Sequence, residues 1–217
     1  MIDLHTHTFF SDGVLSPFEL AYRAKNNGCS VIAITDHIDY SNIEFVVLNI
    51  IKAAKILTSN YDIIVLPGVE LTYIPPDLIK QVAVECREIG AKIVVVHGET
   101  TVENVPPGTN IRAIEACVDI LAHPGHLSEV EAEIAANNNV KIEITTRKGH
   151  GITNKEVAEI AIKKNAKLVL NSDAHNPENL LTRKNVTKVL LESGLTDCYY
   201  KIMQKNAMEI VKNAQKI

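Results

Sequence analysis

The chain has 217 residues, of which 46% are hydrophobic, and its formal net charge at pH 7 is −4. This composition predicts one domain with a sizeable core, and the acidic balance argues against a nucleic-acid scaffold with a basic face. The four cysteines form no Cys-x-x-Cys pair, which predicts reduced thiols rather than a disulfide framework. The sequence shows no long apolar run and no hydrophobic leader, so we expect a soluble, cytoplasmic protein without a membrane partner.

In chain order, a short apolar start predicts a first strand that ends near His5. Strand side chains repeat every two residues, so His5 and His7 can face one space. A polar loop follows, and Ser16 with Glu19 then forms a capping-box pattern that predicts a helix ending at Gly28.

The same strand-then-helix alternation continues to the end of the chain. Further strands are expected at 30–35, 63–66, 92–96, 118–122, 140–144 and 167–170, and further helices at 43–58, 76–89, 110–117, 128–136, 153–165, 177–192 and 197–213. Repeated units of this kind are typical of an α/β protein with parallel strands. Polar residues follow every strand, rather than one switch point, which favours a closed or nearly closed barrel with its site at the carboxyl ends of the strands.

Histidines and carboxylates gather at these strand ends. The set is His5, His7, Asp12, His37, Glu70, His97, His123, Asp173 and His175. Imidazole and carboxylate groups bind zinc, manganese and iron, and this many exceed the needs of one ion. We therefore expect two to three divalent metal ions, with Glu70 able to bridge two of them. For any single histidine the alternative is a structural hydrogen bond.

The order and spacing of these residues resemble a known family. The matching segments are Asp3-x-His5-x-His7, Ser11-Asp12-Gly13, Thr35-Asp36-His37, Pro67-Gly68-Val69-Glu70, His97, Ala122-His123-Pro124 and Ser172-Asp173-Ala174-His175. They are similar to the motifs of the PHP (polymerase and histidinol phosphatase) superfamily, from residue 2 to about residue 180. The resemblance implies a distorted TIM-like (β/α)7 barrel of the PHP type, formed by residues 1–217 as one free-standing PHP domain, and a trinuclear metal centre.

The resemblance also implies which residues hold each ion. It assigns His5, His7, Glu70 and Asp173 to the first ion, Glu70, His97 and His123 to the second, and Asp12, His37 and His175 to the third. Glu70 and Asp173 are thus the expected catalytic carboxylates. Asp12 is the least secure ligand, because the family varies at the third ion.

Basic residues near the sixth predicted strand suggest a phosphate site. Arg147 and Lys148 lie in a glycine-flanked loop, and arginine binds phosphate in a bidentate manner. Arg147 is expected to bind substrate and to act in catalysis. The resemblance implies another arginine after the last motif, for which Arg183 is the candidate, and His150 is expected to face substrate or water. A solvated surface charge is the alternative for each arginine and lysine.

Four further acids lie near the predicted ligands in the sequence. Asp3 and Asp36 are expected either to orient ligand histidines or to bond to backbone, in equal measure. Glu99 and Glu143 could line the pocket.

The expected function is a metal-dependent phosphoesterase, like histidinol phosphatase, that uses metal-activated hydroxide on a small phosphorylated metabolite. One alternative is a nucleotide phosphoesterase in which Phe9, Tyr40 or Tyr73 stacks a base, and another is a single-strand exonuclease. A third is a non-catalytic component of a ribonucleoprotein, which predicts lost ligands and a basic surface. The oligomeric state carries no prediction.

Overall fold

A parallel sheet rolled into a barrel forms the centre of the computed structural model, which describes residues 1–216. Its strands are β1 (Ile2–Asp3), β2 (Val31–Ile34), β3 (His37–Ile38), β4 (Ile64–Leu71), β5 (Ile93–His97), β6 (Ile120–Ala122), β7 (Lys141–Thr145) and β8 (Leu168–Asn171). The strand order is β1-β2-β4-β5-β6-β7-β8, and β3 pairs with β4 beyond the end of β2. Parallel pairing places all their carboxyl ends at one end of the barrel.

The barrel is closed by backbone contacts between the segments after β1 and β8. The amide of Asp173 donates to the carbonyl of His5 at 2.9 Å, and the amide of His7 donates to the carbonyl of Ala174 at 2.9 Å. These bonds join the first and last strands at the end where the predicted ligands emerge. The prediction of a nearly closed α/β barrel is therefore confirmed.

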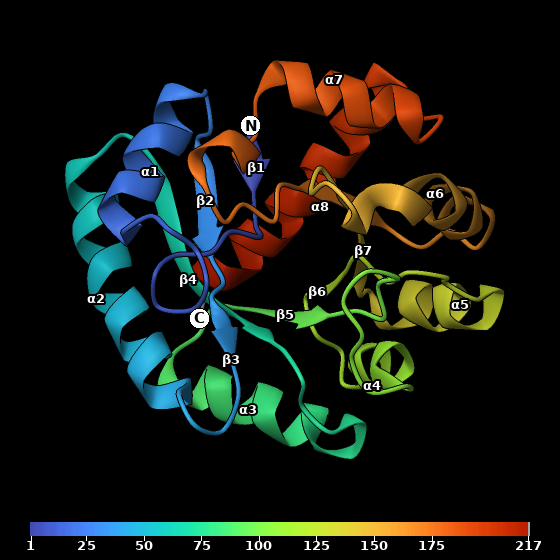
Figure 1. The fold of residues 1–217 in the computed structure, drawn as a ribbon, viewed down its shortest axis with the longest axis horizontal. Helices are drawn as coiled ribbons and strands as arrows, with labels where there is room; N and C mark the ends of the chain where they lie inside the picture. Colours follow the sequence, from blue (N-terminus) through green and yellow to red (C-terminus); the bar gives the residue numbers. More distant parts are fainter. Residues whose placement is uncertain (217) are drawn as a thin grey trace.

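Helices cover the outside of the barrel (Figure 1). They are α1 (Pro17–Asn26), α2 (Ile43–Asn60), α3 (Ile79–Ile89), α4 (Thr109–Glu115), α5 (Glu129–Asn138), α6 (Asn154–Lys163), α7 (Arg183–Glu192) and α8 (Asp197–Lys216), with short 3-10 turns η1 (Pro76–Leu78), η2 (His150–Thr153) and η3 (Pro177–Asn179). At the start of α1 half of the expected capping box forms: the Ser16 hydroxyl accepts from the amide of Glu19 at 3.1 Å, whereas the Glu19 carboxylate accepts from Arg23.

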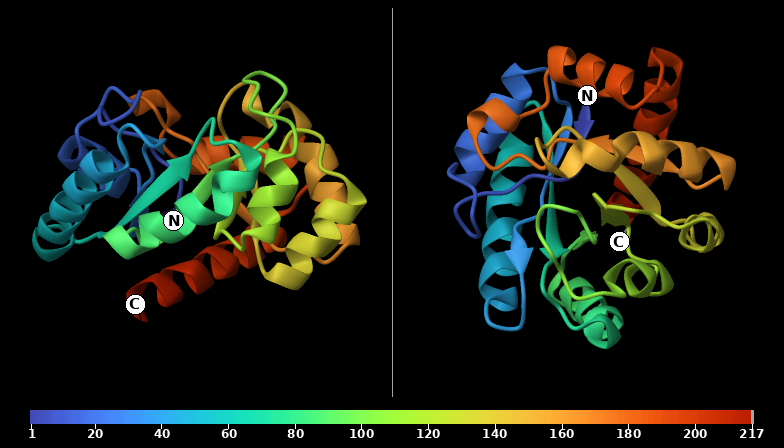
Figure 2. Two further views of the ribbon diagram at one scale, coloured as in Figure 1. Left: turned by 90° about the horizontal axis from the view of Figure 1, so that it is seen from below. Right: turned by 45° about the vertical axis from the view of Figure 1, so that its right-hand side comes forward.

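The last helix closes the amino-terminal end of the barrel. The side chain of Gln204 accepts from the amide of Ile2 at 2.9 Å, and the side chain of Asn206 donates to the carbonyl of Leu168 at 2.8 Å. Apolar residues of α8 such as Ile210 also join the cluster that fills the barrel. The left view of Figure 2 shows α8 on the opposite side of the barrel from the long loops, so α8 does not cover those loops.

Several elements differ from the sequence expectation, including the short strand β3, which was not expected. Strand β4 continues through Pro67 and Gly68, although this pair was expected to end it. Pro67 is tolerated because the neighbouring β5 begins only at Ile93, which pairs with Gly68. A side chain at position 68 would lie 2.8 Å from Thr35, so the glycine permits close strand packing. The expected helix 177–192 is instead the turn η3 followed by α7.

The cysteines divide into two kinds, because Cys29 and Cys86 are buried whereas Cys117 and Cys198 are exposed. Burial raises the pKa of both buried thiols to about 12. Within residues 1–216, no helix combines the length and apolar character that crossing a membrane would need.

Candidate metal centre

All the predicted metal ligands lie at the open end of the barrel. They follow β1 (His5, His7, Asp12), begin β3 (His37), lie in β4 and β5 (Glu70, His97), or follow β6 and β8 (His123, Asp173, His175). Residues 170 positions apart in sequence are therefore brought into one space by closure of the barrel.

Glu70 lies at the middle of this space. Its Oε2 atom is 3.2 Å from Nε2 of His5 and 3.4 Å from Nε2 of His7. The same oxygen is 2.9 Å from Nδ1 of His37, and Oε1 is 3.6 Å from Nε2 of His123. One carboxylate thus faces four imidazoles from three segments of the chain, an arrangement that suits a bridging ligand.

Asp173 completes the first group from the β8 side. Its Oδ1 atom is 3.3 Å from Nε2 of His7 and 3.8 Å from Nε2 of His5, and its Oδ2 atom is 3.6 Å from Nε2 of His123. Asp173 has a positive φ of 51° and His123 one of 24°. Positive φ is costly for residues other than glycine and is typical of functional positions held in place by their surroundings.

A second group surrounds Asp12, whose side chain is exposed. Oδ2 of Asp12 is 3.0 Å from Nε2 of His175, and Oδ1 is 3.6 Å from Nε2 of His37 and 3.9 Å from Nδ1 of His7. One donor atom from each of these four residues lies within 4.8 Å of the others. The three residues that the family resemblance assigns to the third ion are thus together, with His7 beside them.

Unpartnered polar atoms show that these residues fit a metal cluster. Nε2 of His5, both ring nitrogens of His7 and both carboxylate oxygens of Glu70 are buried, and none has a hydrogen-bond partner among residues 1–216. Leaving such atoms without partners is costly. Nitrogen and carboxylate oxygen donors in this number suit divalent ions of the zinc, manganese and iron type.

Interactions among the protein charges shift several pKa values in this cluster. Burial opposes ionisation of Glu70, but His5 and His37 outweigh it and hold the pKa of Glu70 well below its ordinary value. Burial and the neighbouring His97 hold the pKa of His123 well below its ordinary value. The cluster therefore presents an ionised carboxylate next to a neutral imidazole, and both are protonation states that bind metals.

Glu143, which the sequence suggested only as a residue lining the pocket, supports a ligand histidine. Its Oε2 atom lies 2.8 Å from Nδ1 of His5, and the side-chain amide of Asn171 donates to the same oxygen at 2.8 Å. A carboxylate behind a ligand histidine fixes the ring and raises its basicity. The signal in the sequence was a glutamate inside the apolar strand 140–144, where an unpaired charge would be unfavourable.

Asp3 and Asp36 support the site through backbone rather than through histidines. Asp3 accepts from the amide and the hydroxyl of Ser172 at 3.0 and 2.6 Å, next to Asp173. Asp36 accepts from the amide and the hydroxyl of Thr8 at 2.7 Å each. For both acids the structure therefore shows the bond to backbone, which was one of the two expectations. Each bond anchors a segment that carries predicted metal ligands.

The predicted substrate residues do not all lie at the centre. Arg147 does, because its Nη1 atom donates to the carbonyl of Asp173 at 3.1 Å and contacts Nδ1 of His175. Lys148 is exposed and lines a hollow on the outer side of this loop. Arg183 lies 5.8 Å over the ring of Tyr200, in a hollow that includes Met1. This is the amino-terminal side of β1, apart from the ligands, so we leave Arg183 out of the proposed site.

His150 lies closer to the ligands than its sequence position suggested. Its ring centroid is 4.5 Å from that of His123 and 6.0 Å from that of His97. Burial lowers the pKa of His150 to about 4, with a further contribution from His97. Its imidazole is therefore neutral at neutral pH.

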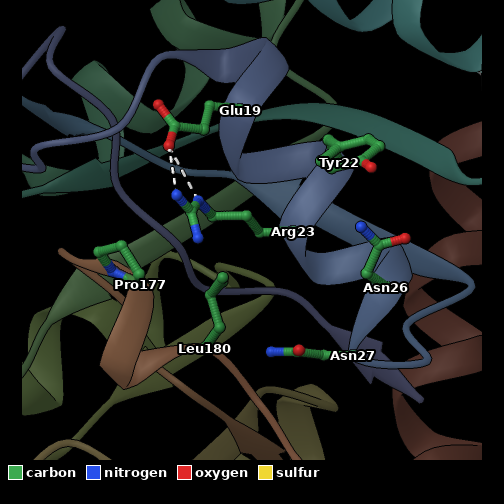
Figure 3. A pocket seen from close by; sticks show the side chains of 7 residues that line it. All are labelled: Glu19, Tyr22, Arg23, Asn26, Asn27, Pro177 and Leu180. Carbon is green, nitrogen blue, oxygen red and sulfur yellow. Dashed lines mark hydrogen bonds and ion pairs between the residues drawn. The ribbon is translucent and has the colours of Figure 1, made fainter.

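Figure 3 shows a separate hollow of about 400 Å³ between α1 and the segment around η3. Arg23 lies in it, paired at 2.8 Å with Glu19. Its lining residues include none of the predicted ligands or substrate residues, so it is not part of the candidate site.

Comparisons with known proteins identify a family and relatives of the chain. The PHP domain family model matches residues 3–180. The chain is 48% identical over 197 residues to an uncharacterized protein of Methanocaldococcus jannaschii, covering 90% of each. It is 26% identical over 204 residues to the DNA polymerase/3'-5' exonuclease PolX of Bacillus subtilis, covering 82% of this chain but 35% of that protein.

Solved structures share the fold at low sequence identity. A chain in archaeal ribonuclease P with mature tRNA matches with a TM-score of 0.74 and 17% identity, covering 100% of this chain and 92% of that chain. A Listeria monocytogenes protein assigned as histidinol phosphatase hisK matches with a TM-score of 0.63 and 14% identity, covering 86% of this chain and 99% of that chain. These likenesses show the fold alone.

Proposed function

The chain belongs to the PHP domain family, and from that membership we propose that this metal-dependent phosphoesterase hydrolyses small phosphomonoesters at a centre of three divalent ions. The observation that carries the proposal is the convergence of the predicted ligands on Glu70 and Asp12. Groups of three or four donors, each within 4.8 Å of one another, lie side by side there and share His5, His7 and His123.

The chemistry follows from the donor set. Bound divalent ions would activate water near neutral pH and neutralise the oxygens of a transferring phosphoryl group. The first ion would be held by His5, His7, Glu70 and Asp173, and the third by Asp12, His37 and His175. The third group would be the one reached from solvent, because the Asp12 side chain is 55% exposed.

Arg147 supplies the expected phosphate contact. Its guanidinium lies against His175 and the carbonyl of Asp173, so it is already at the edge of the ligand cluster. Its position there would orient a phosphate and neutralise charge that develops on the group being transferred.

Two observations favour small substrates over a nucleic acid strand. One is the overall charge, because an acidic chain offers no basic face to hold a polyanion. The net charge is −4, and the other observation is that all the ligand positions are filled. A non-catalytic ribonucleoprotein component would instead be expected to have lost ligands and a basic surface.

A nucleotide phosphoesterase is the second candidate. Phe9, Tyr40 and Tyr73 follow β1, β3 and β4, and their side chains are exposed, so their rings are accessible to a base. The names of the Bacillus subtilis relative and of a Haemophilus influenzae 5'-3' exoribonuclease, 39% identical over 70 residues, extend this candidate to exonuclease activity.

A substrate panel tests the proposal. The protein is loaded with Mn²⁺ or with Zn²⁺ and assayed on p-nitrophenyl phosphate, histidinol phosphate, nucleoside monophosphates, a nucleoside 3',5'-bisphosphate and a labelled single-stranded oligonucleotide. We expect metal-dependent release of phosphate from monoesters, abolished in Glu70→Gln. Faster cleavage of the oligonucleotide than of any monoester would favour the exonuclease, and no turnover of any ester would refute the proposal.

A further inference from the structure

Three histidines from neighbouring strands form a cluster that differs from the ligand set implied by the family resemblance. His97 ends β5, His123 follows β6, and His150 begins η2 after β7. One ring nitrogen from each lies within 4.8 Å of those of the other two. All three side chains are buried. Such convergence of three imidazoles is typical of a metal site.

A carboxylate faces the same cluster from a loop. Oε2 of Glu103 is 3.6 Å from Nε2 of His97 and 4.0 Å from Nε2 of His150. Its other oxygen, Oε1, accepts from the hydroxyl of Tyr73 at 3.2 Å. Tyr73 therefore fixes the orientation in which Oε2 points at the histidines, and its own backbone has a positive φ of 58°.

The remaining ring atoms are consistent with ligation. Nδ1 of His97 lies 3.0 Å from the carbonyl oxygen of Gly98. When Nδ1–H donates a hydrogen bond to that oxygen, Nε2 is left with the lone pair that can bind a metal ion. Nδ1 of His150 and Nδ1 of His123 are buried, and neither has a hydrogen-bond partner among residues 1–216. Leaving buried ring nitrogens without partners is costly, so an ion that orders these rings would stabilise the cluster.

We propose that His150 and Glu103 are metal ligands, and that they complete with His97 and His123 a four-ligand site for the second ion of the centre. Three imidazoles and one carboxylate match the ligand number and types that Zn²⁺ prefers. The proposal rests on the proposed function, because this ion belongs to the same centre. It differs in its ligands, since a family-type second site uses Glu70 where this chain offers His150 and Glu103.

Glu70 and Glu103 approach different sets of histidines, which agrees with their serving different ions. The carboxylate of Glu70 lies within 4 Å of ring nitrogens of His5, His7, His37 and His123. Within residues 1–216, the carboxylate that lies within 4 Å of a ring nitrogen of His97 is that of Glu103. The side chain of Glu103 is 40% exposed, so this ligand comes from the solvent side of the cluster. It would close the second site against water, whereas Asp12 faces solvent in the third.

Metal binding by variants tests the proposal without relying on activity. The full-length chain is stripped of metal and titrated with Zn²⁺ against a chromophoric chelator, and with Co²⁺ while its visible absorption is recorded. We expect His150→Ala to lower the affinity for one equivalent of Zn²⁺ by 10-fold or more. The same variant should lower the visible absorption that Co²⁺ shows in a four-ligand site. His126→Ala is the control, because His126 is an exposed histidine of the loop after β6 that pairs with Glu156.

A second variant keeps the test decisive if His150→Ala does not fold, as judged by circular dichroism. Glu103→Gln changes a partly exposed loop residue and should weaken the same equivalent, and Tyr73→Phe should do so to a smaller extent. Unchanged affinities and an unchanged Co²⁺ spectrum in Glu103→Gln and in any folded His150 variant would overturn the proposal. Loss of that equivalent in a protein that hydrolyses no phosphoester would support this site while refuting the proposed function.

Discussion

Oε2 of Glu143 lies 2.8 Å from Nδ1 of His5, and both side chains are fully buried. This contact sets the other nitrogen of His5 toward Glu70 and Asp173, and the acids Glu70 and Glu143 together outweigh burial and raise the pKa of His5 well above its ordinary value. Metal binding must displace a proton from His5, so the same contact both orients the ligand and stabilises positive charge on it.

Glu143→Gln should therefore weaken metal binding while leaving the fold intact. Glutamine keeps an oxygen for Asn171 but removes the charge that stabilises His5 bound to a cation. We expect a loss of about 10- to 100-fold in affinity for one ion, measured by chelator competition. Glu133→Gln, at an exposed glutamate of α5, is the matched control, and equal affinities in the two variants would remove Glu143 from its supporting role.

Arg147→Ala should impair substrate binding more than metal binding. Loss of a charged donor to phosphate is worth about 1.5–3 kcal/mol, which corresponds to roughly a 10- to 100-fold fall in kcat/KM. Metal content should not change. Arg23→Ala, at the exposed arginine paired with Glu19, should leave kinetics as they are. Wild-type KM and kcat in Arg147→Ala would exclude the proposed phosphate contact.

Asp3 gives the stability of the protein a predictable pH dependence. Burial raises the pKa of Asp3 to about 6 from 3.8, although Ser172 lowers it in part. At a pH between 3.8 and about 6, Asp3 is protonated in the folded state but ionised in the unfolded chain. The resulting stabilisation is fully present below about pH 4 and is lost as the pH rises through about 6.

Urea unfolding of chelated protein measures this effect. Between pH 5 and pH 7.5 the free energy of unfolding of the wild type should fall relative to that of Asp3→Asn by roughly 1 kcal/mol. Asparagine cannot titrate and is the comparison that removes the contributions of all other groups. A difference between the two proteins that is independent of pH would contradict the assignment.

Removal of metal should lower thermal stability. The centre leaves buried donor atoms of His5, His7 and Glu70 without partners, so ions that satisfy them bind the folded state selectively. A metal ion at 100 times its Kd adds about 2.7 kcal/mol to the free energy of unfolding. For a chain of this size this corresponds to a rise of roughly 5–10 °C in Tm. Differential scanning fluorimetry with and without a chelator checks this, and equal Tm values at saturating Mn²⁺ would count against ion binding at this cluster.

The sequence predicted the barrel and its ligand positions because both depend on local patterns. Apolar runs ending in His, Asp or Glu mark strands whose carboxyl ends meet, so His5, Glu70 and His123 could be placed together without coordinates. The length of β4 could not be predicted, because Pro67 is tolerated only where β5 has not yet begun. That condition is a matter of strand register, which no single segment encodes.

Supporting roles were harder to predict because they depend on packing between distant segments. Glu143 faces His5 across 138 positions of sequence, and Asp3 faces Ser172 across 169. Glu103 carries no motif, and its approach to His97 depends on a loop that Tyr73 holds in place. A sequence shows such residues only as acids in unexpected surroundings.

Anomalous diffraction from crystals of the Mn²⁺-loaded protein tests the central claim most directly. The account predicts one anomalous peak in contact with Glu70, a second among His97, His123 and His150, and a third beside Asp12 and His175. A metal-loaded, catalytically active crystal form with no anomalous peak in contact with Glu70 would contradict it.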